Sequence, residues 1–255
     1  MNLITHSYGQ GPDLVLIHGW GLNSGVWQSL IEQLQAHFTL TTIDLPGFGL
    51  NCGNLPVQYD LQALARMILP HVPQNACVLG WSLGGLVAQQ MALLSPQHLG
   101  RLIVVASSPC FIKQADWPGI KPEVLDQFQQ QLASNLSATI SRFLAIQAMG
   151  SPTAKQDIKL LKQQIDQYPQ PDPLALAAGL QILAQSDLRS DLATLRMPCD
   201  FILGRLDSLV PYALQQQLLT LAPQIKVHLF EKSSHAPFIS EPQRFIKLLT
   251  ELVRN

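Results

Sequence analysis

The sequence has few cysteines, few charged residues and no charge excess of either sign. Its four cysteines in 255 residues lack C-x-x-C spacing and metal-like pairing with histidine, and they are too sparse for a disulfide scaffold. We therefore expect buried or half-buried thiols and no bound metal or other cofactor. The 16 basic and 17 acidic residues leave a net charge of −1, so the whole molecule carries no electrostatic footprint for nucleic acid.

The sequence also lacks targeting and membrane signals. The opening residues, MNLITHSYGQGPD, have neither the basic start nor the apolar stretch of a secretory signal, and no apolar run reaches the roughly 18 residues of a membrane-spanning helix. We expect a soluble, cytoplasmic protein without membrane contact, which we take to be a monomer. Its hydrophobic content of 47% is ample for a sizeable core.

Short apolar segments alternate with amphipathic ones in the first 110 residues and again after residue 187. This alternation predicts an α/β fold with a mostly parallel sheet that is covered by helices on both faces. The predicted strands span 14–17, 39–43, 77–79, 102–105, 199–204 and 225–230, and the predicted helices of the first half span 25–36, 61–69 and 83–94.

Residues 111–187 differ from the rest of the chain because they contain no convincing strand. Thr153 with Gln156 resembles a capping box, and Asp172 followed by Pro173 is typical of a helix start. We interpret 111–187 as a helical cap inserted into one domain, 1–255, whose core is 1–110 and 188–255. Apolar residues recur there at helical spacing, at Leu125, Phe128, Leu132, Leu136, Ile140 and Phe143.

The most informative motif is G-W-S-L-G at 80–84, between a predicted strand and a predicted helix. G-x-S-x-G in this context forces the serine into a tight turn that lifts its hydroxyl clear of the sheet. Ser82 is therefore the candidate nucleophile. The pattern alone is modest evidence, so partners are needed elsewhere in the chain.

Those partners follow other predicted strands. Asp207 comes three residues after one strand, and His235 lies in the loop after the last one. The order serine, acid, histidine is that of the α/β-hydrolases. The turn after the first strand offers the Trp20 backbone N–H, which together with that of Leu83 suits a tetrahedral oxyanion. The sequence thus predicts a Ser82-His235-Asp207 triad.

Other residues compete for these roles. His18 sits in the turn beside Trp20, where we interpret it as a structural hydrogen-bonding group. Asp44 also ends a strand but precedes Ser82 in the chain, so we assign it to stabilising a turn. Asp200 begins its strand, at the wrong end for the site.

Several motifs together resemble the pimeloyl-[acyl-carrier-protein] methyl ester esterases of biotin synthesis, and the likeness covers nearly the whole chain. The resemblance implies a carboxylesterase that removes the methyl ester from pimeloyl on acyl carrier protein and releases methanol. It also implies that Trp20 and Leu83 line the oxyanion side and that Phe143 and Gln147 face the acyl chain from the cap. The motifs are HGWG (18–21), DLPGFG (44–49), GWSLGG (80–85), SSPCF (107–111), WPGIKP (117–122) and SHAPFIS (234–240), of which WPGIKP and SHAPFIS are the more specific.

The same resemblance implies a basic cap surface that meets the acidic carrier protein. Arg142, Lys155, Lys159 and Lys162 fit this role, and the three lysines share one helical face. An ordinary solvated face is the alternative interpretation. Two departures from the family pattern are Ala138, where a further basic residue can stand, and the loop Gly49-Leu50-Asn51.

Other functions are compatible with the same triad. A general short-chain carboxylesterase and a carbon–carbon bond hydrolase are alternatives within the fold, and a non-catalytic ligand receptor is an alternative of another class. Nothing in the sequence disables the triad, which favours an enzyme.

Overall fold

A computed structural model describes residues 2–149 and 153–254 of the chain. Its centre is a seven-stranded sheet in the order β1-β3-β2-β4-β5-β6-β7, and every neighbouring pair except β1 and β3 is parallel. The predicted mostly parallel sheet is confirmed. The strands are β1 Thr5–Tyr8, β2 Asp13–Ile17, β3 Thr39–Ile43, β4 Cys77–Trp81, β5 Arg101–Val105, β6 Cys199–Gly204 and β7 Lys226–Phe230.

Helices cover both faces of the sheet because successive strand residues point to opposite sides. Val15 and Ile17 of β2 pack with one hydrophobic cluster, which includes α2, α3 and α8, whereas Leu14 and Leu16 pack with another, which includes α1 and α10. These helices, with the short α9, are α1 Gln28–Leu34, α2 Leu61–Ile68, α3 Leu83–Leu94, α8 Leu214–Leu221, α9 Pro237–Ser240 and α10 Pro242–Arg254. Short 3-10 helices also lie in the connections, namely η1 Ser24–Trp27, η2 Gly49–Asn51, η3 Leu69–His71 and η4 Arg189–Thr194.

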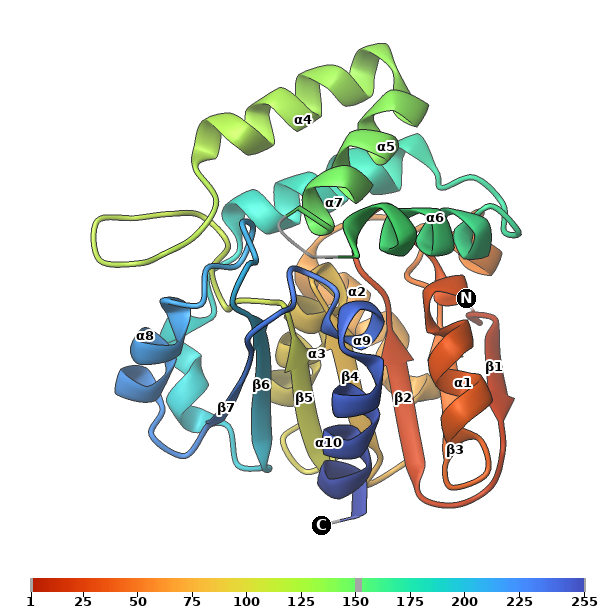
Figure 1. Ribbon diagram of the computed structural model, residues 1–255, viewed down its shortest axis with the longest axis vertical. Coiled ribbons are helices and arrows are strands. Elements are labelled where there is room, and N and C mark those ends of the chain that lie inside the picture. The colour runs from red at the N-terminus through yellow and green to blue at the C-terminus, as the bar shows by residue number, and fades with distance from the viewer. Residues whose placement is uncertain (1, 150–152, 255) are drawn as a thin grey trace.

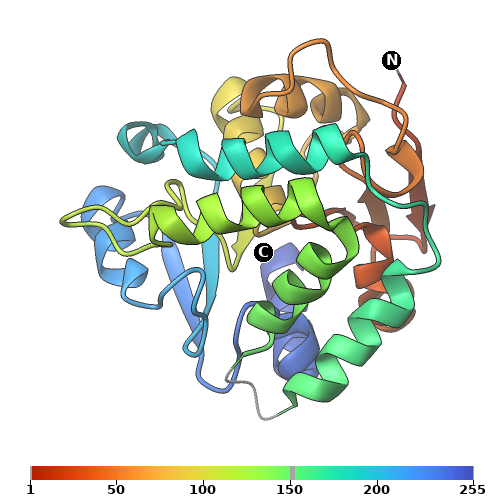
Figure 2. The same cartoon turned by 90° about the horizontal axis from the view of Figure 1, so that it is seen from above.

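Four helices form a layer above the carboxyl ends of the parallel strands, seen at the top of Figure 1 and from above in Figure 2. We call them the helical layer: α4 Pro122–Ser134, α5 Leu136–Gln147, α6 Ala154–Ile165 and α7 Pro173–Gln185. Among the described residues of 111–187 there are isolated β-bridges but no strand, as predicted.

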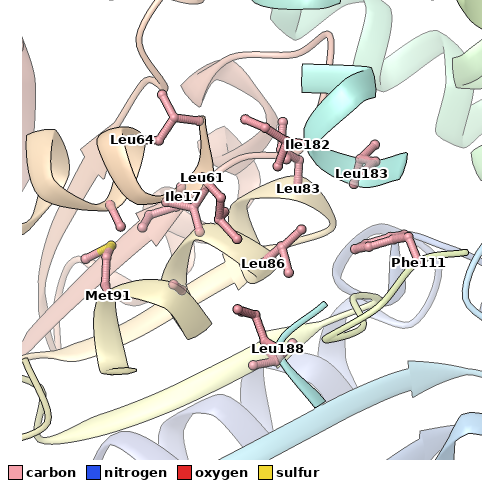
Figure 3. Close-up of a cluster of buried hydrophobic side chains, with 14 of the residues drawn as sticks. Ile17, Leu61, Leu64, Leu83, Leu86, Met91, Phe111, Ile182, Leu183 and Leu188 are labelled. Carbon is pink, nitrogen blue, oxygen red and sulfur yellow. The ribbon is translucent and has the colours of Figure 1, made fainter. Parts of the chain in front are cut away.

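The helical layer shares its core with the sheet. Ile182 and Leu183 of α7 belong to the same buried cluster as Leu83 and Leu86 of α3, and Figure 3 shows Ile182 beside Leu83. Burying a leucine or isoleucine side chain contributes roughly 1.5–3 kcal/mol. This packing fixes α7 over the start of α3.

The structure adds local details that the sequence did not indicate. The strand β1 was not predicted, because its residues THSY lack the apolar alternation of a core strand and form an antiparallel edge. The apolar run through 125–143 is divided at Asn135, whose side chain accepts a hydrogen bond from the Ala138 N–H and caps α5. Thr153 precedes α6 but makes no side-chain capping bond, since its hydroxyl donates to Asp157. The start of α7 is as predicted, with Asp172 accepting from the Leu174 N–H.

Candidate active site

Ser82 occupies a strained turn between β4 and α3. Its φ of 56° and ψ of −119° are unusual for a residue with a side chain. The turn is held from both sides, because the Ser82 N–H donates to Val105 at 3.0 Å and the Ser82 carbonyl accepts from Gly85 at 2.9 Å and Leu86 at 3.1 Å. The surrounding fold thus fixes a conformation that places the hydroxyl at the edge of the sheet.

Glycines let the chain pack closely around this turn. A Cβ on Gly84 would overlap the backbone carbonyl oxygens of Ile17 and His18. A Cβ on Gly19 would stand 3.1 Å from the Cβ of Ser82. The turn after β2 is therefore pressed directly against the serine, as the oxyanion prediction requires.

The structure brings Ser82, His235 and Asp207 into one line. The Ser82 Oγ lies 2.9 Å from the His235 Nε2, and the His235 Nδ1 lies 2.7 Å from the Asp207 Oδ2. All three residues are at most 6% exposed. They are 153 and 28 residues apart in the chain and come together because each follows the carboxyl end of a parallel strand.

The hydrogen bonds of Asp207 set the tautomer of His235. The Asp207 Oδ1 accepts the N–H groups of Leu209 at 2.8 Å and Val210 at 3.0 Å, which orients Oδ2 toward the imidazole. A carboxylate only accepts, so the Nδ1 of His235 carries the proton and Nε2 is free to accept from the serine hydroxyl. This arrangement can move a proton from Ser82 to His235 as the oxygen attacks.

The two residues whose N–H groups are predicted to bind an oxyanion adjoin Ser82 in different ways. The Leu83 N–H is at the first position of α3, where a helix has no backbone acceptor for it. Trp20 belongs to the turn that Gly19 presses against Ser82, and its indole is directed into the helical layer, where Nε1 donates to the Leu176 carbonyl at 2.8 Å.

The two predicted acyl contacts come from one face of α5. Phe143 and Gln147 are both buried, and the Phe143 ring lies 4.8 Å from the ring of Trp20. The backbone carbonyl of Gln147 accepts the His235 N–H at 3.1 Å. Within the described residues, the buried Gln147 Oε1 has no hydrogen-bond partner, so it is available to a bound polar group.

His18 and Asp44 form a separate structural group. The Asp44 carboxylate accepts the N–H groups of Ser24 at 2.5 Å and Leu50 at 2.8 Å. The His18 Nε2 accepts the Leu45 N–H at 3.0 Å, so its Nδ1 is the protonated nitrogen that faces the Gly19 carbonyl. Burial lowers the pKa of His18 despite the attraction of Asp44, which keeps the ring neutral. These contacts fit the structural roles predicted for both residues.

Asp200 lies at the opposite end of the sheet, as predicted. It is fully buried and bonds Arg101 and, at 2.8 Å, the His228 Nε2. Burial on its own raises the pKa of Asp200, but the hydrogen bonds and positive charges of His228 and Arg101 together outweigh it and hold the pKa below its usual range. This group ties β5, β6 and β7 together at a distance from Ser82.

The four predicted basic residues are exposed on the helical layer. We call Arg142 of α5 and Lys155, Lys159 and Lys162 of α6 the basic patch. In the described part of the chain none of them forms an ion pair. The Arg142 guanidinium instead donates to the Gln131 side chain and lies 5.4 Å from the centre of the Phe128 ring. Among the described residues, no carboxylate therefore pairs with the Arg142 charge.

The cysteines are free thiols. Cys77, Cys110 and Cys199 are buried and Cys52 is half-buried, as expected. Burial raises the pKa of Cys77 to about 12, which keeps this thiol protonated. Over residues 2–149 and 153–254 no cluster of three or more histidine, cysteine, aspartate or glutamate side chains could hold a metal ion, and no helix there is long and apolar enough to cross a membrane.

One residue of the site was missed from the sequence. The indole Nε1 of Trp81 donates to the His235 carbonyl at 2.7 Å. The only signal was a large donor side chain immediately before the nucleophile, in a position that the motif leaves variable.

The family model described as alpha/beta hydrolase fold matches residues 12–242. The chain belongs to the alpha/beta hydrolase family. Among curated relatives, a protein of Pseudoalteromonas atlantica named pimeloyl-[acyl-carrier protein] methyl ester esterase is 52% identical and aligns over 98% of this chain and 97% of its own length. A protein of the same name from Vibrio vulnificus is 50% identical over 96% of this chain and 95% of its own. Among solved structures, an esterase from Exiguobacterium antarcticum has a TM-score of 0.86 at 20% identity, covering 99% of this chain and 96% of that one, and supports the fold.

Proposed function

We propose that the chain is a serine carboxylesterase that hydrolyses the methyl ester of pimeloyl-[acyl-carrier protein], giving the pimeloyl carboxylate and methanol in biotin synthesis. The reaction type is supported by the 2.9 Å hydrogen bond between the Ser82 Oγ and the His235 Nε2, together with the hydrogen bond between His235 and Asp207. The substrate is supported by the name of relatives that are 50–52% identical over nearly the full chain.

In the first half of the reaction, the Ser82 oxygen attacks the ester carbonyl carbon while the His235 Nε2 takes the hydroxyl proton. The carbonyl oxygen becomes an oxyanion. We assign its stabilisation to the backbone N–H groups of Trp20 and Leu83, which are rigid donors in a buried site. Collapse of the tetrahedral species breaks the bond to the methoxy oxygen, which receives the proton from His235 and leaves as methanol.

In the second half, water attacks the acyl-serine and gives its proton to the His235 Nε2. The Ser82 oxygen then leaves and recovers a proton from His235, which releases the pimeloyl carboxylate. The balance is one ester and one water consumed for one carboxylate, one methanol and one proton. Asp207 stays a carboxylate throughout and stabilises the imidazolium that forms twice in each cycle.

We assign residues 111–187 to a cap on a single domain, with 1–110 and 188–255 as its core. The cap would supply the acyl pocket through Phe143, whose ring contacts Trp20, and through the Gln147 Oε1, which has no hydrogen-bond partner among the described residues. The chain would thereby hold an aliphatic acyl group against an aromatic wall. The cytoplasmic location, the monomeric state and the lack of nucleic-acid contact stay predictions.

We assign the basic patch to the carrier protein. Exposed cations that no carboxylate neutralises attract an acidic partner and speed its encounter, and the effect weakens as salt is added. The patch lies on α5 and α6, and α5 also supplies the proposed acyl contacts. A carrier protein bound there would lie close to the residues proposed to contact its acyl chain.

The main experiment is hydrolysis of pimeloyl methyl ester attached to the carrier protein, followed by mass spectrometry of the carrier and by assay of methanol. We expect the wild-type protein to remove one methyl group. The Ser82→Ala protein should fold but should not hydrolyse the ester. We also expect the wild-type gene, and not the Ser82→Ala gene, to restore growth to a biotin-requiring strain that lacks this esterase. A wild-type protein that cleaves small esters but leaves the carrier-bound ester intact would contradict the proposed substrate.

The carrier contact has its own test, the double variant Arg142→Glu with Lys159→Glu. Its kcat/KM for the carrier-bound ester should fall about tenfold or more at low salt, while cleavage of a small soluble ester should hardly change. A matched control is Lys226→Glu with Lys247→Glu, which reverses two exposed lysines away from the helical layer. Equal losses in both double variants would mean that the patch is only solvated surface.

A further inference from the structure

The backbone of His235 is held on both sides by hydrogen bonds. Its N–H donates to the Gln147 carbonyl at 3.1 Å, and its carbonyl accepts the indole Nε1–H of Trp81 at 2.7 Å. The first bond comes from the last residue of α5, and the second comes from the last residue of β4. The loop that carries the proposed base is therefore fastened to the strand that immediately precedes the proposed nucleophile.

Packing fixes the donor of the second bond. Trp81 is fully buried, and its ring lies 6.1 Å from that of Trp27, 4.9 Å from that of Phe238 and 5.9 Å from that of His235. A side chain enclosed in this way cannot turn its N–H elsewhere without opening a cavity. The indole therefore sets where the His235 carbonyl can lie.

Loss of this donor would act on the chemistry through position. A buried carbonyl without a donor is unfavourable, so the loop would shift to find another partner. The Nε2 of His235 has to stay within hydrogen-bond reach of the Ser82 Oγ, and a misplacement of about 1 Å in a catalytic geometry can cost about 100-fold in rate.

We infer that Trp81 is a positioning residue, whose indole N–H holds the His235 backbone so that Nε2 faces the Ser82 hydroxyl. This inference rests on the proposed function, since it needs His235 to be the base. In the proposed reaction Trp81 contacts neither the ester nor the proton that moves between Ser82 and His235. Its effect should therefore appear in kcat, whereas binding of a small ester should stay as it is.

The test compares Trp81→Phe with Trp27→Phe, using a small chromogenic ester and a temperature well below both melting points. Trp27 is the matched control because it is fully buried in the same aromatic group, while its Nε1 has no hydrogen-bond partner among the described residues. Both variants lose the same atoms. We expect kcat to fall about 10- to 100-fold in Trp81→Phe with KM within about twofold, and to stay within about threefold of wild type in Trp27→Phe.

A second replacement covers the case in which Trp81→Phe does not fold. Site-specific replacement of Trp81 by 3-benzothienylalanine keeps both rings and substitutes sulfur for the N–H, so it should lower kcat as Trp81→Phe does. A kcat equal to that of wild type in this protein, or equal losses in Trp81→Phe and Trp27→Phe, would overturn the inference. Ser82→Ala distinguishes failure of this inference from failure of the proposed function, because an active Ser82→Ala protein would overturn the proposed function.

Discussion

Replacement of Asp207 by asparagine should disable the site by reversing a hydrogen bond. One carboxylate oxygen accepts two backbone N–H groups, from Leu209 and Val210, and the other faces the His235 Nδ1 at 2.7 Å. An asparagine side chain has one acceptor oxygen and one donor amide. The oxygen will face the two N–H groups, because the amide there would leave two buried donors unpaired. The amide then points at His235.

An amide that donates to the Nδ1 of His235 stabilises the wrong tautomer. The ring proton moves to Nε2, which can no longer accept the Ser82 hydroxyl proton. A loss of about 10⁴ in kcat is typical when a triad loses its carboxylate in this way. The fold should be retained, since the two N–H groups keep their acceptor.

The control is Asp44→Asn, a buried carboxylate that also accepts two backbone N–H groups, here with one on each oxygen. Its amide must face one of these donors, so we expect a loss of about 1–3 kcal/mol in stability and little change in kcat. Steady-state kinetics on a small ester and thermal unfolding of both variants decide the matter. An active Asp207→Asn protein, or a folded but inactive Asp44→Asn protein, would refute the assignment of the two acids.

Two further predictions concern residues that surround the candidate active site. Burial lowers the pKa of His18 below its ordinary value of about 6.5. On acidification the His18 side chain is therefore protonated in the unfolded chain before it is protonated in the folded protein. The free energy of unfolding falls as the pH drops below about 6.5. Urea unfolding from pH 7 to pH 5 should show a steeper loss for wild type than for His18→Gln, and parallel curves would argue against a neutral buried ring. Gly84→Ala would drive a Cβ into the carbonyl oxygens of Ile17 and His18, and should destabilise the protein by about 1–3 kcal/mol while lowering kcat. An unchanged melting temperature and kcat would contradict that close contact.

Much of the fold could be predicted because its elements are short and strongly patterned. The buried parallel strands are near-continuous apolar runs, and each predicted strand was found within about two residues of its place. The edge strand β1 was missed because its pairing with β3 is a tertiary contact made by the polar residues THSY. The break at Asn135 was missed because the apolar spacing continues across it, although Asn135 itself is a good helix cap.

The candidate site was partly predictable for a related reason. Chain order and strand ends were enough to predict that Ser82, Asp207 and His235 lie together, because parallel strands bring their carboxyl ends to one edge. The bonds that adjust the geometry could not be predicted in the same way. Trp81 and His235 are 154 residues apart, and no sequence pattern relates an indole to a distant backbone carbonyl.

Fluorophosphonate labelling, measured by intact-protein and peptide mass spectrometry, is a direct test of Ser82 as the nucleophile. We expect one phosphonyl group per wild-type chain, located on Ser82, and no label on a folded Ser82→Ala protein. Stoichiometric labelling of Ser82→Ala, or a label at any other residue of the wild-type chain, would contradict the assignment of Ser82 as the nucleophile.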